Sequence, residues 1–244
     1  MAGHSAWKNI KRRKAAVDAK RGKIWSKVSR AIIVAAQRGG GDIKFNASLR
    51  LAVDEAKAVN MPRDTIEKAI KKGTGEGSTE RFEATRYEAF GPGGTAILID
   101  LLIANANRTA AEIRTILDKN GGKMGVPGSV AFGFTQQGVI LIPTSSGSED
   151  AVMEVALQAD ADDVSSDGEY VQVTCKPADF EKLRAALEGA KFALESAEIT
   201  YSPQSTVALD VDASKELLEL IDAIEDHDDV QKVFHNAEIA DDVE

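Results

Sequence analysis

The sequence predicts a multi-domain α+β protein. An N-terminal basic arm and three-helix bundle are followed by two ferredoxin-like α/β domains, the last inserted in the middle one. Three observations carry this prediction. Charge is distributed unevenly along the 244 residues, apolar residues follow a helical period as far as Gly73, and strands alternate with helices after Thr85. A chain of this length can form two or three compact domains.

The charge asymmetry points to a partner. The first thirty residues hold ten Lys or Arg and one acid, Asp18. Through Arg81 the chain has 19 Lys and Arg against 8 Asp and Glu, and the remainder has 11 against 31. The net charges are therefore +11 and −20, which together give the −9 of the whole chain. A basic segment attracts a polyanion because each neutralised phosphate releases counterions, so nucleic acid is the favoured partner.

The front of the chain is expected to be an arm followed by helices. From Lys8 to Lys23 the charges would fall on every side of a helix, so we expect a mobile segment that a partner orders. From Ile24 to Arg38 the spacing of Val28 and Ile32 indicates a helix with one buried face. Its cations lie within about 80° of one another on another side; they are Lys23, Lys27, Arg30 and Arg38.

Two more helices complete the predicted bundle. Gly39-Gly40-Gly41 should end the first helix, and Asn46 to Val59 should form the second, with Leu49, Val53 and Ala56 facing inward. Pro62 suits the first turn of a third helix, which should stop at Gly73. The polar, glycine-containing stretch from Thr74 to Ser78 is typical of a linker.

The next segment predicts half of an α/β domain. We expect strands from Thr85 to Phe90 and from Thr95 to Ala104, with Gly91-Pro92-Gly93-Gly94 as the turn between them. A helix from Thr109 to Asn120 and a short strand from Ser129 to Phe134 should follow. The other half comes after Pro203, as a strand, a helix and a strand at 206–211, 214–226 and 230–236.

A complete β-α-β-β-α-β pattern lies between these halves, with Asp167-Gly168 suited to its central hairpin. Its expected elements are 139–142, 149–158, 163–165, 170–175, 178–188 and 194–201. The domains predicted from these patterns are 1–80, the discontinuous 81–135 plus 204–244, and the inserted 136–203. A tandem, uninterrupted arrangement is the alternative.

Sequence motifs give little support for catalysis, and we predict a protein that is not an enzyme, with no metal and no cofactor. The three histidines are scattered, and the single Cys175 lies on a predicted core strand face. Gly91-Pro92-Gly93-Gly94 and Gly121-Gly122-Lys123 lack the context of a phosphate loop. The segment from Asp163 resembles a calcium loop, but Thr174 stands where its bidentate Glu is needed.

Composition also bears on location. The N-terminus lacks the apolar run of a signal peptide, and no apolar stretch is long enough for a membrane span. One cysteine excludes an intramolecular disulfide framework and fits a reducing compartment. A cytoplasmic protein with no membrane partner and no small-molecule substrate is expected.

The candidate nucleic-acid contacts are the cations of the arm and first helix, with Trp7 among them as a base-stacking group. They are Trp7, Lys8, Lys11, Arg12, Arg13, Lys14, Lys20, Arg21, Lys23, Lys27 and Arg30. A Lys-rich tail that only aids solubility is the plain alternative, and Trp7 could simply pin the arm to the bundle. A candidate anion-binding loop holds Asn107 and Arg108 at a helix N-terminus, where simple capping is the alternative.

Many short motifs in this chain resemble the YebC/PmpR family, which includes the mitochondrial translational activator of cytochrome oxidase subunit one. The resemblance is densest in the N-terminal block and continues over nearly the whole chain. It rests on Met1 to Ser5, Trp7, Asn9 to Lys11, Arg13 to Ala16, Asp18 to Lys23, Gly39 to Asp42, Asn60 to Pro62, Ile70 to Gly75, Tyr87-Glu88, Gly91 to Gly94, Asn107 to Thr109, Lys119 to Gly122, Gly128 to Ala131, Asp229 to Gln231 and Asn236.

The resemblance implies a helical first domain and two α/β domains. It also implies regulation of gene expression through a nucleic acid. Members are described as transcriptional regulators that bind DNA, and also as ribosome-associated, RNA-binding factors that help elongation through proline runs. Transcription regulation through DNA is our leading expectation, and translation at the ribosome is the alternative. Ala6 and Ala106 depart from the residues usual in the family, Lys and Arg.

Overall fold

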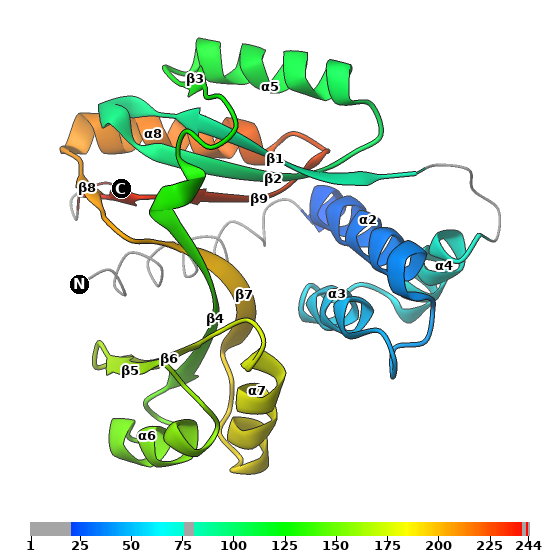
Figure 1. Cartoon of the computed structure of the whole chain (residues 1–244), viewed down its shortest axis with the longest axis vertical. Helices are drawn as coiled ribbons and strands as arrows, with labels where there is room; N and C mark the ends of the chain where they lie inside the picture. The colour runs from blue at the N-terminus through cyan, green and yellow to red at the C-terminus, as the bar shows by residue number, and fades with distance from the viewer. Residues whose placement is uncertain (1–20, 76–80, 241–242, 244) are drawn as a thin grey trace. The chain divides into compact units, whose positions relative to one another are not determined.

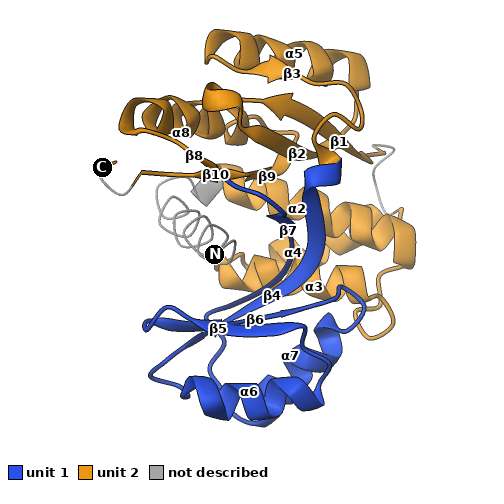
Figure 2. Cartoon of the chain, turned by 60° about the vertical axis from the view of Figure 1, so that its left-hand side comes forward, with its two compact units in different colours: residues 1–9, 132–206 blue, residues 10–131, 207–244 orange. Residues whose placement is uncertain are grey.

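The computed structural model describes residues 21–75, 81–240 and 243 of the chain. It divides into two compact units (Figure 2). One unit is built from Phe132–Thr206, and the other from the described residues on either side of that segment. The fold class is α+β, as predicted, with N-terminal helices followed by α/β domains.

Three helices form a bundle in the larger unit: α2 (Arg21–Gly39), α3 (Ala47–Ala58) and α4 (Arg63–Gly73) (Figure 1). Each turns an apolar stripe toward a common core, as the helical spacing predicts. The fully buried centre consists of Ile32, Leu49 and Ala56. All three are inward positions predicted for the first two helices, and the predicted Val28 and Val53 are also buried.

The connection from α2 to α3 is held by one side chain. The chain leaves α2 through Gly40, whose φ of +80° favours glycine, and the Gly40 N–H donates to Ala36 O at 2.9 Å. Asn46 then caps α3 by accepting from the Leu49 N–H, and its amide donates to Ala35 O and Gly40 O, both at 2.8 Å. A buried Asn therefore ties both helices to the loop between them.

The same unit contains a four-stranded sheet in the order β3-β1-β2-β9. Its strands are β1 (Glu83–Phe90), β2 (Ala96–Ile103), β3 (Lys123–Met124) and β9 (Val230–His235), all antiparallel to their neighbours. A separate two-stranded parallel sheet is formed by β8 (Val207–Ala208), which precedes α8 (Val211–Glu225) in the chain, and β10 (Ala237–Glu238), which follows β9. Since β9 pairs with β2, the segment after 206 completes a sheet begun before 132.

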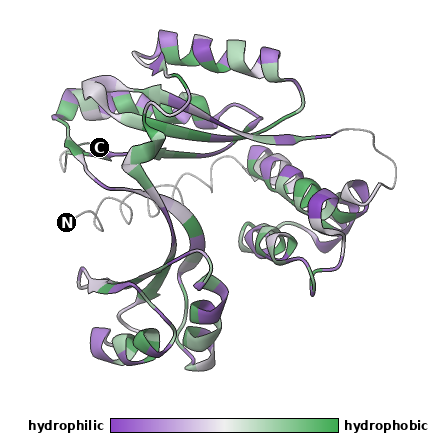
Figure 3. Cartoon of the chain, in the orientation of Figure 1, coloured by the Kyte–Doolittle hydropathy of each residue, from purple (hydrophilic) through white to green (hydrophobic). Residues whose placement is uncertain are grey.

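Helices α5 (Ala106–Lys119) and α8 (Val211–Glu225) supply the apolar cover of this sheet. Ile113 and Leu117 of α5, with Leu217 and Leu220 of α8, share a core with the alternate β2 residues Ile97, Ile99, Leu101 and Ile103. Figure 3 shows hydrophobic colour concentrated in the strands, whereas the two helices carry both colours. The period-two pattern of β2 thus decides which sheet face the helices cover.

The short strand predicted from Ser129 to Phe134 is wrong. Residues Ala131–Gly133 form a 3-10 turn, and Phe134 begins the ten-residue strand β4. The reason is the Glu88 carboxylate, which accepts hydrogen bonds from the N–H groups of Gly128, Val130 and Ala131 at 2.6–2.9 Å. Backbone donors engaged by a side chain cannot join a strand ladder.

Two helices begin three residues earlier than predicted, because side chains before them act as caps. Asn105 accepts from the Arg108 N–H at 3.1 Å, so α5 starts at Ala106 rather than Thr109. Asp210 accepts from the Ala213 N–H at 2.8 Å, so α8 starts at Val211 rather than Ser214. This cap also shortens the strand predicted at 206–211 to β8.

The smaller unit has the predicted β-α-β-β-α-β order. Its antiparallel sheet runs β5-β6-β4-β7, the ferredoxin-like arrangement. The elements are β4 (Phe134–Pro143), α6 (Glu149–Gln158), β5 (Asp163–Ser166), β6 (Tyr170–Cys175), α7 (Phe180–Gly189) and β7 (Ser196–Pro203). A Cβ at Gly138 would lie 2.6 Å from the Phe180 ring, so glycine lets α7 approach the sheet.

Candidate nucleic-acid interface

The predicted nucleic-acid contacts fall partly outside the described residues. Those outside are Trp7, Lys8, Lys11, Arg12, Arg13, Lys14 and Lys20. Arg21 is the first residue of α2, and Lys23, Lys27 and Arg30 follow on the same helix. The described side chains of the candidate interface are therefore Lys23, Lys27 and Arg30, which form one stripe of α2 that we call the α2 stripe.

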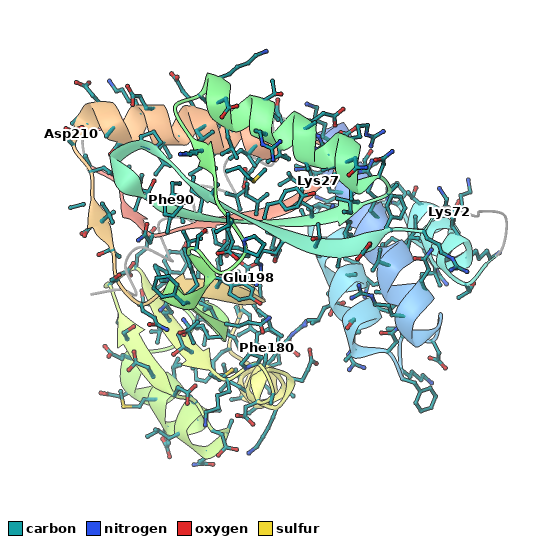
Figure 4. The ribbon with its side chains drawn as sticks, turned by 45° about the horizontal axis from the view of Figure 1, so that its top comes forward. Lys27, Lys72, Phe90, Phe180, Glu198 and Asp210 are labelled. Carbon is teal, nitrogen blue, oxygen red and sulfur yellow. The ribbon has the colours of Figure 1, made fainter. Side chains whose placement is uncertain are left out.

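The α2 stripe contacts an acidic turn of the same unit, which we define as Glu225–Asp229, from the last residue of α8 to the residue before β9. The Lys23 ammonium lies 3.4 Å from an Asp226 carboxylate oxygen. Lys27, labelled in Figure 4, donates to the main-chain carbonyl of Glu225. The stripe therefore engages carboxylate and carbonyl oxygens of the protein itself.

These contacts follow from the end of α8. The last carbonyls of a helix have no partner within the helix and carry partial negative charge. Lys23 and Lys27 approach the end of α8, where Lys23 also donates to Asp226 O. The side chains of Lys23 and Asp226 are 50% and 44% exposed, so this ion pair contributes about 1 kcal/mol at most.

Arg30 makes the strongest connection, through Asp229. Its guanidinium lies 2.8 Å from Asp229 Oδ1, donates to Asp228 O, and stacks 5.5 Å from the centre of the Phe82 ring. The Asp229 side chain is 3% exposed. A buried carboxylate requires compensation by hydrogen bonds and opposite charge, which Arg30 supplies from α2.

The remaining partners of Asp229 come from the first turn of α5. Thr109 donates its hydroxyl to Asp229 Oδ2 at 2.6 Å, and Arg108 approaches the same oxygen at 3.4 Å. The Asp229 N–H donates to His227 Nδ1, and His227 Nε2 lies 2.9 Å from Glu112 Oε2. One aspartate thus links α2, α5 and the start of β9.

The pKa of Asp229 reflects this balance. Burial alone would raise it, but the Thr109 hydrogen bond and the charges of Arg30, His227 and Arg108 outweigh burial and hold the pKa below its ordinary value. Asp229 therefore carries a negative charge at neutral pH. This carboxylate is the anion that the structure places beside the first turn of α5.

The candidate anion-binding loop is consequently close to an anion of the chain itself. Asn107 is exposed, and Asn105 rather than Asn107 caps α5. Arg108 shares its charge between Asp229 and, at 3.8 Å, Glu112. Binding of an external anion at Asn107 and Arg108 stays a prediction.

A cavity of about 570 Å³ lies beside the acidic turn, between α2 and the sheet. Lys23, Lys27 and Val28 line it from α2, and Arg86 and Asp100 from the sheet. Arg86 and Asp100 form a bidentate pair at 2.6 and 3.0 Å. The charges that line this cavity therefore include both signs.

Arg38, the last cation of the predicted face, lies apart from the acidic turn. It lines a second hollow of about 370 Å³ together with Arg81, Phe82 and Glu83. The face predicted from helical geometry therefore divides into two places. Lys23, Lys27 and Arg30 meet the acidic turn, and Arg38 does not line the cavity beside it.

Sequence reasoning missed the acidic turn and Asp229. Four acids in the five residues from Glu225 to Asp229 were one available signal, since they complement the charge of α2. Helical and strand periodicity describe each element alone, however, and give no pairing between α2 and a turn almost 200 residues later. The role of Thr109 depends on that same unpredicted contact.

The described residues offer little reactive chemistry. Cys175 is buried, as predicted, and burial with the charges of Asp162 and Asp179 raises the pKa of its thiol to about 11. At neutral pH it is therefore a protonated thiol and a poor nucleophile. In 21–75 and 81–240 no group of three or more His, Cys, Asp or Glu is arranged to hold a metal ion. No helix in these ranges is long and apolar enough to cross a membrane.

Comparison with known proteins places these observations in a family. Residues 5–76 match the TACO1/YebC protein N-terminal domain, and residues 82–237 match the TACO1/YebC second and third domain. A "Probable transcriptional regulatory protein" of Rubrobacter xylanophilus is 48% identical over 244 residues, which cover 100% of this chain and 98% of that protein. One of the same name from Solidesulfovibrio magneticus is 48% identical over 243 residues, covering 100% and 99%.

A solved structure agrees with the sequence comparisons. The crystal structure of the conserved hypothetical protein Aq1575 from Aquifex aeolicus superposes with a TM-score of 0.83 at 39% sequence identity. The match covers 93% of this chain and 94% of that one. Matches to all three domains, relatives of similar length and a shared fold lead to one conclusion: the chain belongs to the TACO1/YebC family.

Proposed function

We propose that this protein is a non-catalytic regulator of gene expression that binds nucleic acid through its basic arm and the cations of α2. The concentration of ten Lys and Arg in the first thirty residues carries the proposal. Relatives of the same length named probable transcriptional regulatory proteins support a role in transcription, with DNA as the target. The acidic remainder restricts which side of the protein approaches the polyanion.

The cations of the α2 stripe would bind phosphate by exchanging their present partners, the oxygens of the acidic turn, for phosphate oxygens. Lys27 and Arg30 contact carbonyl and carboxylate oxygens of the acidic turn, and phosphate oxygens are acceptors of the same kind. The arm has a long reach, about 65 Å for 20 extended residues. It would bind first, and a phosphate backbone brought near α2 would then compete with the acidic turn for these cations.

A role in translation, through RNA of the ribosome, is the second candidate. The side chains of α3 and α4 on the surface are mainly Lys, Arg, Asp and Glu, such as Glu55, Lys57, Arg63 and Lys68. A DNA-reading helix usually presents Asn, Gln and Arg to base edges. Contact with phosphates rather than bases suits a structured RNA cleft as well as DNA.

The arm can be tested through the salt dependence of binding. The plot of log K against log salt has a negative slope. Changing Arg12, Arg13 and Lys14 together to Ala should reduce the magnitude of this slope by about two to three units, because each lost phosphate contact removes about 0.7–0.9 units. Fluorescence anisotropy with a labelled oligonucleotide over a salt series measures this slope.

The control removes three cations from the acidic part of the chain. Changing Arg114, Lys119 and Lys176, all exposed, to Ala alters net charge equally and should leave the slope unchanged. An arm variant that keeps the wild-type slope would exclude the arm from the interface. Equal losses in both variants would mean that net charge, and not the arm, governs binding.

Sedimentation separates the two candidate targets. A factor acting in translation should migrate with ribosomal particles in a sucrose gradient at low salt and leave them at high salt. Migration as the isolated protein, together with footprinting protection of a defined promoter, is the result expected for a transcriptional regulator. The two experiments use the same full-length chain.

A further inference from the structure

The most exposed apolar side chain identified in the described residues is Phe45, in the loop between α2 and α3. It is 88% exposed, and Ile43 beside it is 37% exposed. A phenyl ring in water forgoes roughly 1.5–3 kcal/mol that burial would give. A partner that covers the ring would recover part of this free energy.

The loop that carries Phe45 is rigidly built. Asp42 accepts the Lys44 N–H with its carboxylate at 2.9 Å and the Phe45 N–H with its carbonyl at 3.2 Å. The Asn46 side chain, 6% exposed as a residue, fixes the other end by its three hydrogen bonds to α2, the loop and α3. Gly39 leaves room for this amide, since a Cβ there would lie 2.6 Å from Asn46 Nδ2.

Two cations flank Phe45. Lys44 precedes it, and Arg50 on α3 donates to Ile43 O at 3.4 Å. The start of the loop is held against α4, where Gly41 faces Thr74 and Ile70. Asp42 is the acid of the loop, and its carboxylate already accepts a backbone N–H.

We propose that Phe45, with Lys44 and the neighbouring cation Arg50, forms a second nucleic-acid site, which binds unpaired nucleotides. The ring stacks on one base, and the cations contact the adjoining phosphates. Aromatic rings interleaved with cations bind single strands in this way, since every base has a stacking face. This inference rests on the proposed function and names a ligand class for a different surface.

The position of the loop distinguishes it from the arm. The arm joins α2 at Arg21, and the loop follows its other end, Gly39. Nineteen helical residues span roughly 28 Å at about 1.5 Å per residue. One strand could therefore contact the arm at one end of α2 and Phe45 at the other, which would raise the overall affinity by linkage of two weak sites.

Substitution of the ring tests the site. Phe45→Leu keeps an apolar side chain but removes the stacking surface. It should weaken binding of a 30-nucleotide single strand by roughly 5- to 150-fold, the loss expected for one stacked base. The salt slope should stay unchanged because no charge is lost, whereas Lys44→Gln should lower it by about one unit. Affinity for a blunt duplex should not change in Phe45→Leu.

The control is Phe132→Leu, the same change at another ring, 79% exposed, in the smaller unit. It should bind both oligonucleotides like the wild type, and thermal unfolding should be unchanged in both variants. Suppose that Phe45→Leu binds the single strand with wild-type affinity, while the arm variant shows the expected smaller salt slope. This result would overturn the Phe45 site and leave the proposed function standing. Equal weakening on single strand and duplex would also overturn it. Wild-type protein that binds neither oligonucleotide contradicts the proposed function itself.

Discussion

Changing Asp229 to Asn is expected to lower the free energy of unfolding of the larger unit by about 2–3 kcal/mol. The substitution keeps the shape of the side chain but removes the charge that Arg30 and Arg108 face. Arg30 keeps its bond to Asp228 O and has a side chain 22% exposed, so the loss stays below that of a fully buried pair. Urea denaturation followed by circular dichroism measures the change.

The same variant should bind nucleic acid more tightly. Without the Asp229 charge, the acidic turn competes less well for Arg30, and a phosphate replaces a weaker partner. The expected result is a change of opposite sign in the two measurements: lower stability and higher affinity. A variant that is destabilised but binds as before would show that the α2 stripe stays on the acidic turn in the complex.

Asp228→Asn is the matched control for this experiment. Asp228 is exposed and contacts Arg30 through its main-chain carbonyl, which the substitution retains. It removes one negative charge from the same turn without removing the carboxylate that binds Arg30. Its stability should stay within about 0.5 kcal/mol of the wild type. Equal effects of the two variants would assign the result to net charge rather than to Asp229.

The sequence was sufficient for the α+β class and for most elements because local patterns determine them. The bundle helices followed from the spacing of residues such as Ile32 and Leu49, which are both fully buried. The β-α-β-β-α-β order followed from alternation and from the turn at Asp167-Gly168, where the Asp167 N–H donates to Tyr170 O at 3.2 Å. Propensity and periodicity operate within a single element.

The elements placed wrongly are those decided by a distant side chain. The strand predicted from Ser129 to Phe134 does not form because Glu88, some 40 residues earlier, accepts the N–H groups of Val130 and Ala131 within it and of Gly128 just before it. The contacts of Lys27 and Arg30 with the acidic turn span 198 and 199 residues. Such pairings are properties of the tertiary fold, and one sequence read along its length does not specify them.

Glu88 supplies the second large prediction. Glu88→Gln should destabilise the larger unit by about 2–4 kcal/mol at neutral pH, because a Gln amide has one acceptor oxygen for donors that two carboxylate oxygens now satisfy. The N–H groups of Gly128, Val130 and Ala131 should also exchange with solvent faster. Hydrogen exchange followed by mass spectrometry over this loop gives a local readout that global unfolding does not.

The effect of Glu88 should depend on pH in a direction fixed by its pKa. Burial alone would raise that pKa, but hydrogen bonds from Val130, Gly128 and Ala131, with the charge of Arg86, outweigh it and lower the pKa below its ordinary value of 4.5. A carboxylate with a depressed folded pKa stabilises the protein above its unfolded pKa and loses that contribution as pH falls through the folded value. The stability difference between wild type and Glu88→Gln should therefore be constant from pH 6 to about pH 8 and shrink below about pH 4.5. A difference that grows in acid would contradict the role given to the Glu88 charge.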